Sequence, residues 1–470
     1  MKKTVLMFFL IASGITVCQE NQILEKPVVD QRIELLSIVF RLAENSEYSS
    51  RRFPIYIEKI EKHFNQYKNH DLIKYVKNNL KKRGIGYDAV MSMSISISSP
   101  PEFNPLLPFS ETLPDKRWSE KRAEKFLRLL RKFYLDTNCE LFFKENHELY
   151  HESSKRFIDV YNNLDIEWFT KFYGEKPKGV FRIINGLGNG GANYGPKIVL
   201  HNEEVIYAIM GTWSVDSLGM PKYNLPKYFP TLLHEFSHSY VNHLIKKHEN
   251  ELRKSGQVIF KPLKDGMKSQ AYSSWNTMYA EGVVRASVIK YMKDHNYDEN
   301  FIKAEIKDEI DKGFIWTLEL VNELECYDAN RDQYLTLEDF MPEIVQFFNQ
   351  TAINIDEIEE EIEYKRPKVV KIIPFNNGSQ NVNSSINKIE VLFDRPLKGK
   401  GYSISQGSKG KRYFPEIGKV SYSKSRTSLI IELKLKKNKK YQFILTGKSF
   451  KSEKGFGMNN YEIFFKTAKN

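Results

Sequence analysis

The chain has 470 residues, of which 41% are hydrophobic and 28% charged, and its formal net charge is +12. These proportions exclude a disordered or fibrous chain and suit a globular protein of two or three domains. A nucleic-acid-binding stripe would interleave cations with aromatic residues, and no such run occurs. We therefore expect a lysine-rich solvated surface and no nucleic-acid partner.

The N-terminus has the pattern of a targeting segment. Two lysines precede the apolar run Val5–Val17, which is too short to span a membrane. We predict a signal peptide over residues 1–18 and an exported protein, which would be periplasmic, outer-membrane-associated or extracellular. Ile15–Cys18 also resembles a lipobox in which Cys18 would carry a lipid anchor, although Val17 stands where a small residue is usual. We expect no transmembrane segment elsewhere.

Helical periodicity dominates the first third of the chain. Apolar residues recur at helix spacing from Val28 to about Lys82. Ala89–Ser98 alternates Met and Ile with Ser, which fits either a strand or a helix with a small-residue face. The proline-rich stretch Ser99–Pro114 predicts a loop. Two long helices are expected over Arg117–His147 and Glu152–Phe172.

Three short β-branched or aromatic runs follow, at Gly179–Ile184, Pro196–His201 and Val205–Thr212. Their turn-rich separations indicate antiparallel strands. Asn185–Gly195 contains five glycines but lacks the lysine and serine of a phosphate-binding loop. We interpret it as a flexible loop between two strands.

The chain then returns to helices before a β-rich end. We expect a helix over Thr231–His248 with Pro230 at its first turn, and another over Asn276–Lys293. More helices continue to Tyr364. A boundary is expected at Arg366–Pro367, because alternating strands separated by turn residues begin just after it.

Residues 366–470 resemble the bacterial Ig-like domains that are appended to secreted enzymes. The resemblance implies a β-sandwich that acts as a spacer or an adhesive module. The residues that carry it are Pro374, Asn377-Gly378, Val382, the alternating run Ile389–Leu397 and the late strand Tyr441–Leu445.

Residues 234–238 read His-Glu-Phe-Ser-His, the HExxH pattern of zinc-dependent hydrolases. Positions four apart lie on one face of a helix, so His234 and His238 could offer two imidazoles to one Zn²⁺ ion. Glu235 is rotated by about 100° from His234 and would reach a water molecule instead. This pattern predicts two metal ligands and a general base.

A catalytic zinc needs a third protein ligand. The metzincin arrangement would require Gly and His where the chain has Val241 and Leu244, and His243 points almost opposite His234 on the helix. The gluzincin arrangement takes a glutamate from a later helix, and Glu281 is the best candidate. Arg285, one turn on, could hold Glu281 in place. The alternatives are an ordinary Glu–Arg surface pair, or Glu323 or Glu325 as the ligand.

From about Val29 to Phe348 the chain resembles an uncharacterised bacterial family of gluzincin-like metallopeptidases, catalogued as a domain of unknown function. The resemblance implies His234, His238 and Glu281 as zinc ligands and Glu235 as the base. It further implies an α+β fold with a zincin-like core, a small mixed sheet and a helical part, over residues 19–365. The motifs that carry it are Val29–Ser37, Gly84–Val90, Asn193–Gly195, His234–His238 and Glu281–Ala286.

We thus expect an exported zinc metallopeptidase whose substrate is a peptide or protein. Tyr194, Tyr272 and Tyr279 are unranked candidates for the hydrogen-bond donor to the oxyanion. Two alternatives stay open: a surface interaction protein with a structural or degenerate zinc site, and a zinc hydrolase of non-peptide amides. The sequence carries no signal for an oligomeric state.

Two further sequence patterns, a stretch similar to a calcium-binding loop and a pair of cysteines, each have two interpretations. Asp328–Asp339 mimics an EF-hand calcium loop, but Gln333 replaces its glycine and Asp339 replaces the usual glutamate. A helix-capping loop is the favoured interpretation. Cys139 and Cys326 form either one disulfide or two free thiols.

Overall fold

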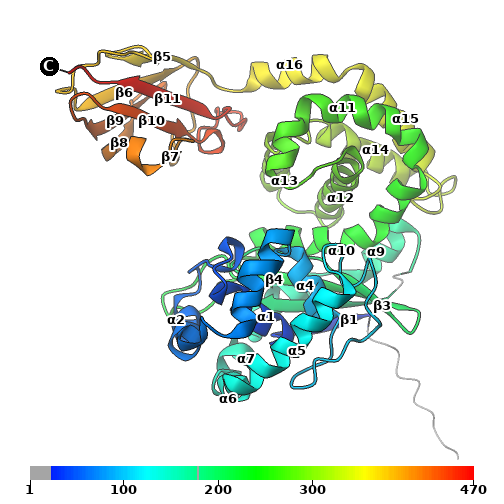
Figure 1. Ribbon diagram of the computed structural model, residues 1–470. Coiled ribbons are helices and arrows are strands. Elements are labelled where there is room, and N and C mark those ends of the chain that lie inside the picture. The colour runs from blue at the N-terminus through cyan, green and yellow to red at the C-terminus, as the bar shows by residue number, and fades with distance from the viewer. Residues whose placement is uncertain (1–22, 177–178, 470) are drawn as a thin grey trace, which may run out of the picture. The chain divides into compact units, whose positions relative to one another are not determined.

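The computed structural model describes residues 23–176 and 179–469 (Figure 1). The expected signal peptide, with Cys18, lies outside these residues. The chain divides into two compact units, one over Met1–Thr170 and Lys176–Phe236 and the other over Lys171–Glu175 and Ser237–Asn470. Both helices and sheets are present, which confirms the α+β class. Within the described ranges, no helix combines the length and apolarity that a membrane span requires.

The N-terminal half of the first unit is helical, as predicted. The Ala89–Ser98 stretch is a helix to Ile95, and the hydroxyls of Ser94 and Ser96 are satisfied by backbone carbonyls within the turn before them. The expected helix Arg117–His147 is broken at Asn138, whose φ of 50° is left-handed. The expected helix Glu152–Phe172 is likewise divided, with breaks after Arg156 and Asn162. The helices are α1 (Gln31–Leu42), α2 (Pro54–Phe64), α3 (Asp71–Tyr75), α4 (Asp88–Ile95), α5 (Glu120–Asp136), α6 (Cys139–Glu145), α7 (His147–Arg156), α8 (Ile158–Asn162) and α9 (Ile166–Tyr173).

The sheet of this unit has the strand order β1-β2-β4-β3 and is mixed. Its strands are β1 (Leu24–Val28), β2 (Gly179–Gly186), β3 (Lys197–Leu200) and β4 (Glu203–Gly211). β1, β2 and β4 are parallel, so the prediction of three antiparallel strands is wrong for β2 and β4. The loop after β2 carries the chain past β4, and β3 then returns antiparallel to β4 through a two-residue turn. His201 and Asn202 in that turn both have positive φ, as such turns require.

The glycine-rich loop after β2 is packed, not open, which corrects the expectation of flexibility. A Cβ atom on Gly190 would lie 2.1 Å from the carbonyl oxygen of Glu47. Gly211, at the end of β4, touches the Gly191 backbone, where a Cβ would approach to 2.6 Å. The glycines are therefore required by close backbone approach.

Glu34 on α1 is a fully buried acid that binds this loop. Its two oxygens accept hydrogen bonds from the backbone N–H groups of Leu187, at 2.7 Å, and Gly188, at 3.0 Å. Burial raises the pKa of Glu34 from 4.5 to about 7, although the Tyr56 hydroxyl and these two N–H groups oppose the shift. The carboxyl group is therefore neutral over much of the acidic range.

This shift predicts a pH-dependent stability. The pKa is higher in the folded chain than in the unfolded one, so the Glu34 contribution is fully present below pH 4.5 and is lost as pH rises through about 7. The loss corresponds to about 3 kcal/mol. Denaturant unfolding at several pH values should show this decline in the wild type and not in Glu34→Gln. An identical pH profile in both proteins would contradict it.

The second unit begins with a helical part. α10 starts earlier than predicted, so Pro230 lies inside the helix and Pro226 occupies the first turn. Gly282 on α12 lets Trp316 pack closely, because a Cβ there would lie 3.2 Å from the indole nitrogen. The helices are α10 (Leu225–Lys247), which spans the unit boundary, α11 (Glu249–Ser269), α12 (Trp275–Asp294), α13 (Glu299–Asp311), α14 (Thr317–Ala329), α15 (Met341–Ile353) and α16 (Ile355–Lys365).

The rest of the second unit is built from strands, as predicted from Val369 onward, with two short 3-10 helices at Lys411–Tyr413 and Gly447–Ser449. Two antiparallel sheets have the orders β5-β6-β9-β8 and β11-β10-β7. Alternate side chains of their strands form one apolar core. The strands are β5 (Val369–Ile373), β6 (Lys388–Phe393), β7 (Ile404–Gln406), β8 (Glu416–Tyr422), β9 (Ser428–Lys434), β10 (Lys440–Leu445) and β11 (Tyr461–Lys466). Cys139 and Cys326 are both free thiols.

Candidate metal centre

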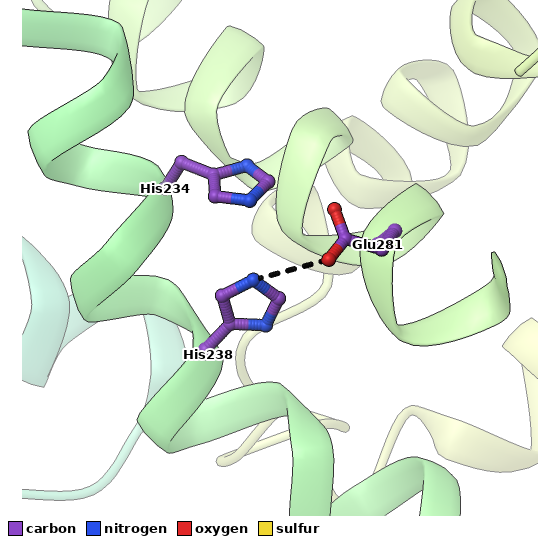
Figure 2. Close-up of side chains that lie close together, drawn as sticks. All are labelled: His234, His238 and Glu281. Carbon is purple, nitrogen blue, oxygen red and sulfur yellow. Dashed lines mark ion pairs between the residues drawn. The ribbon is translucent and has the colours of Figure 1, made fainter. Parts of the chain in front are cut away.

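His234 and His238 lie one turn apart on α10, and Glu281 faces them from α12 (Figure 2). One ligand atom from each of the three residues lies within 4.8 Å of the other two. The Nε2 atom of His238 is 3.5 Å from Oε1 of Glu281. A tetrahedral zinc ion with bonds of 2.0–2.2 Å separates its ligand atoms by about 3.4 Å. The three residues therefore fit a metal ion in donor type and in spacing.

Asn242 orients His238. Its Oδ1 atom lies 3.1 Å from Nδ1 of His238, one turn earlier on α10. An amide oxygen is an acceptor, so this contact places the imidazole proton on Nδ1 and leaves Nε2, the atom nearer Glu281, free to bind a metal. Sequence reasoning missed Asn242, although its spacing of four from His238 on a helix was a usable signal.

Arg285 holds the glutamate, as expected. Its Nη2 atom donates to Oε2 of Glu281 at 3.2 Å and to the Tyr272 hydroxyl at 2.9 Å. Its Nη1 atom donates to Glu309 at 2.6 Å, and the Phe314 ring lies 4.6 Å from the guanidinium. The side chains of Glu281 and Arg285 are each only 10% exposed, so they are not an ordinary surface pair.

The charge balance of this cluster favours an ionised arginine. Burial works against the guanidinium charge, but Glu309 and Glu281 outweigh it and raise the pKa of Arg285. Because Arg285 stays charged, it can share its donors between the two carboxylates. Glu309 thus holds Arg285 in place, and Arg285 in turn holds Glu281. Sequence reasoning missed Glu309.

The three tyrosines proposed as oxyanion donors have different surroundings. Tyr272 is half-buried, and its pKa is raised by burial and by the neighbouring Glu281. Tyr279 is fully buried, with its ring stacked on Phe348. Tyr194 belongs to the first unit, where its hydroxyl neighbours Tyr48. The hydroxyl of Tyr272 neighbours Glu281, a member of the metal group.

Glu235 is in contact with the glycine-rich loop of the first unit. A Cβ atom built on Gly195 would lie only 2.4 Å from its Oε2 atom. The carboxylate thus rests against the Gly195 backbone, directly before β3 begins.

The other metal-like patterns do not form a cluster. His243 lies 3.8 Å from Glu175, outside the metal group. Asp328 accepts from Lys290 at 2.8 Å, and Asp339 accepts from the backbone N–H and the hydroxyl of Thr336. In the described part of the chain, the triad with Glu281 is the group found with metal-ligand spacing. Asp328 is thus engaged in an ion pair and Asp339 in a turn with Thr336, and neither side chain caps a helix.

The metal group opens onto a groove of about 350 Å³ along α10 and α12. His238 and Glu281 line it together with Asn242, Ile245, Lys246, Glu249, Asn276, Thr277 and Ala280. A site meant only to stabilise the fold would be closed by four protein ligands. Three ligands beside an open groove suit a site that admits a substrate.

Asn242→Ala should weaken zinc binding by about 10–100-fold, because His238 loses the group that fixes its tautomer and ring orientation. Asn242→Asp keeps the acceptor and should bind zinc nearly as well as the wild type. Lys246→Ala, which also alters the groove but not His238, serves as the control. Competition with a chromogenic chelator gives the affinities, and equal affinity for all four proteins would contradict this role.

Comparison with known proteins assigns the chain to a protein family. The model of a domain of unknown function, DUF4932, matches residues 26–347. No curated protein matches the chain.

Three solved structures of the bacterial surface layer protein SbsC also align. They comprise domains 1–6, the N-terminal part and a third fragment, with identities of 14%, 15% and 12% and TM-scores of 0.18, 0.17 and 0.18. The alignments cover 51%, 51% and 85% of this chain, which spans 34%, 58% and 46% of theirs. Scores this low do not place the chain in their fold.

Proposed function

The chain belongs to the DUF4932 family, and we propose that it is a zinc metallopeptidase of the gluzincin type. The observation that carries the proposal is the convergence of two histidines and a glutamate within 4.8 Å, with Glu235 following the first histidine. A structural site would have no need of a base at that position, so the motif favours catalysis over a surface interaction protein.

In this proposal each residue of the site has a separate role in amide hydrolysis. His234, His238 and Glu281 would hold zinc, which when bound lowers the pKa of a coordinated water and polarises a carbonyl group. Glu235 accepts a proton from the attacking water and delivers it to the leaving amine. Tyr272 is our candidate donor to the oxyanion, because its hydroxyl neighbours Glu281.

The edge strand β3 favours an extended peptide as substrate. It pairs with β4 on one side, and it is the last strand of the sheet order. An edge strand offers unpaired backbone groups to which a peptide can add as a further strand. The contact of Gly195 with Glu235 puts the start of this strand beside the base.

Our proposal also covers the fold of the two parts of the chain and the export of the protein. We interpret the mixed sheet followed by the HExxH helix as a zincin-like core, and the two C-terminal sheets as an Ig-like spacer or adhesive module. The N-terminal apolar run supports an exported enzyme, in which Cys18 is a candidate for lipid attachment.

The test is a digest of a peptide library by the purified full chain. We expect about one equivalent of zinc by elemental analysis, cleavage of peptides, loss of cleavage with a chelator and recovery on zinc addition. Cleavage of non-peptide amides alone would favour the other hydrolase class. Bound zinc without hydrolysis would favour a surface interaction protein and overturn the proposal.

A further inference from the structure

We propose that the glycine-rich loop between β2 and β3 is a positioning element for Glu235, with Glu34 as its anchor and Gly195 as its point of contact. The proposal rests on the proposed function, because it takes Glu235 to be the base. It concerns residues of the first unit alone, and it gives a role to a buried acid that the reaction itself does not use.

The anchor is built around the Glu34 carboxyl group. Glu34 is 0% exposed, and its two oxygens accept from consecutive backbone N–H groups, those of Leu187 and Gly188. A Cβ on Gly188 would lie 3.0 Å from Oε2 of Glu34, so the glycine allows this close approach. The Tyr56 hydroxyl, itself 3.0 Å from the Tyr150 hydroxyl, completes the surroundings of the carboxyl group.

Between the anchor and Gly195 the loop is held by one hydrogen bond of its own and by hydrogen bonds to β4. The Asn189 side chain donates to the carbonyl of Ala192 at 2.8 Å, and Oδ1 of Asn193 accepts from the Gly211 N–H at 3.0 Å. Tyr194 then exchanges backbone hydrogen bonds with Ile209, at 3.1 and 2.9 Å. The loop is thus fixed by hydrogen bonds at Asn189, Asn193 and Tyr194, between the anchor and Gly195.

The contact point is the missing side chain of Gly195. A Cβ there would lie 2.4 Å from Oε2 and 3.5 Å from Cδ of Glu235, so the glycine backbone forms a wall for the carboxylate. A methyl group would collide with the end of a flexible side chain and not with backbone. We therefore expect Gly195→Ala to displace the base while the fold keeps its stability.

The effect on catalysis follows from the geometry of proton transfer. A displacement of about 1 Å at a reacting group can lower the rate by about 100-fold. We expect Gly195→Ala to reduce kcat by about that factor, with KM and zinc content unchanged. Glu34→Gln keeps one acceptor and turns an N–H donor toward the other loop N–H, so we expect a loss in kcat of about tenfold, and a larger loss in Glu34→Ala.

A control variant separates positioning from the addition of a methyl group as such. Gly266→Ala adds the same methyl group where no atom lies within 4 Å. This variant should keep the wild-type kcat, and a loss of kcat as large as that of Gly195→Ala would contradict the positioning role.

The deciding experiment is the double-mutant cycle of Glu34→Gln and Gly195→Ala in the full chain. If both act on Glu235 through one loop, their effects on kcat are less than multiplicative. Multiplicative effects, or unchanged kcat in either single variant, would overturn the positioning role even if Glu235→Gln is inactive, in which case the proposed function stands. If the wild type lacks hydrolysis, the proposed function fails. Amide hydrogen exchange then tests whether Glu34 anchors the loop. Faster exchange of the Tyr194–Gly195 amides in Glu34→Gln would support the anchorage, and unchanged exchange would refute it.

Discussion

Glu235→Gln should lower the rate of peptide hydrolysis by about 10²–10⁴-fold, which is the usual contribution of a general base, and should leave the zinc content unchanged. Glutamine has nearly the same shape but cannot accept the proton of the attacking water. Because Glu235 is outside the ligand group, its replacement removes no metal ligand. The measurement is kcat/KM on a peptide identified in the library digest, with zinc determined on the same sample.

Glu319→Gln is the matched control, since Glu319 is an exposed residue on α14. It should retain the wild-type rate. Full activity in Glu235→Gln would show that the mechanism is wrong, and loss of zinc from that variant would show that the substitution disturbs the ligands themselves.

Glu281→Ala should reduce the affinity for zinc by more than about 100-fold, the upper end of the loss seen when a residue behind the ligands is removed. Only His234 and His238 would remain, and two protein ligands do not make a stable zinc site. Arg285 keeps its ion pair with Glu309 in this variant, so the fold should survive. Zinc content after dialysis and chelator competition measure the change.

Glu325→Ala tests the rival ligand position. Glu325 forms an ion pair with Lys293, and in the described residues it is outside the group with metal-ligand spacing. Its replacement should leave zinc binding unchanged. Undiminished zinc in Glu281→Ala, or zinc loss in Glu325→Ala, would mean that Glu281 is not the third ligand.

Local periodicity made the core of the candidate site predictable. The alignment of His234 with His238 follows from helix geometry, and it holds wherever that helix lies. Glu281 could be chosen because its helix was readable from the sequence and follows His238 by 43 residues. The helical first third, α12 and the all-β end were predictable for the same reason, since apolar spacing reports on local structure.

Strand pairing was not predictable in the same way. β1 went unrecognised, and β2 was expected to pair antiparallel with its neighbours but is parallel to both β1 and β4. A strand's own residues show which faces are buried, but they do not state the direction of its partners. That direction depends on where the connecting loop carries the chain, which local spacing does not encode.

The sequence by itself determined the residue types of the candidate site: two histidines, a glutamate next to the first of them, and a later glutamate with an arginine one turn beyond. The tertiary structure alone decided what surrounds them. Glu309 meets Arg285 from another helix, and Gly195 meets Glu235 from a loop that Glu34 holds. The physical reason is that helix geometry acts over a few residues, whereas buried contacts join groups far apart in the sequence, and the packing of whole elements selects them.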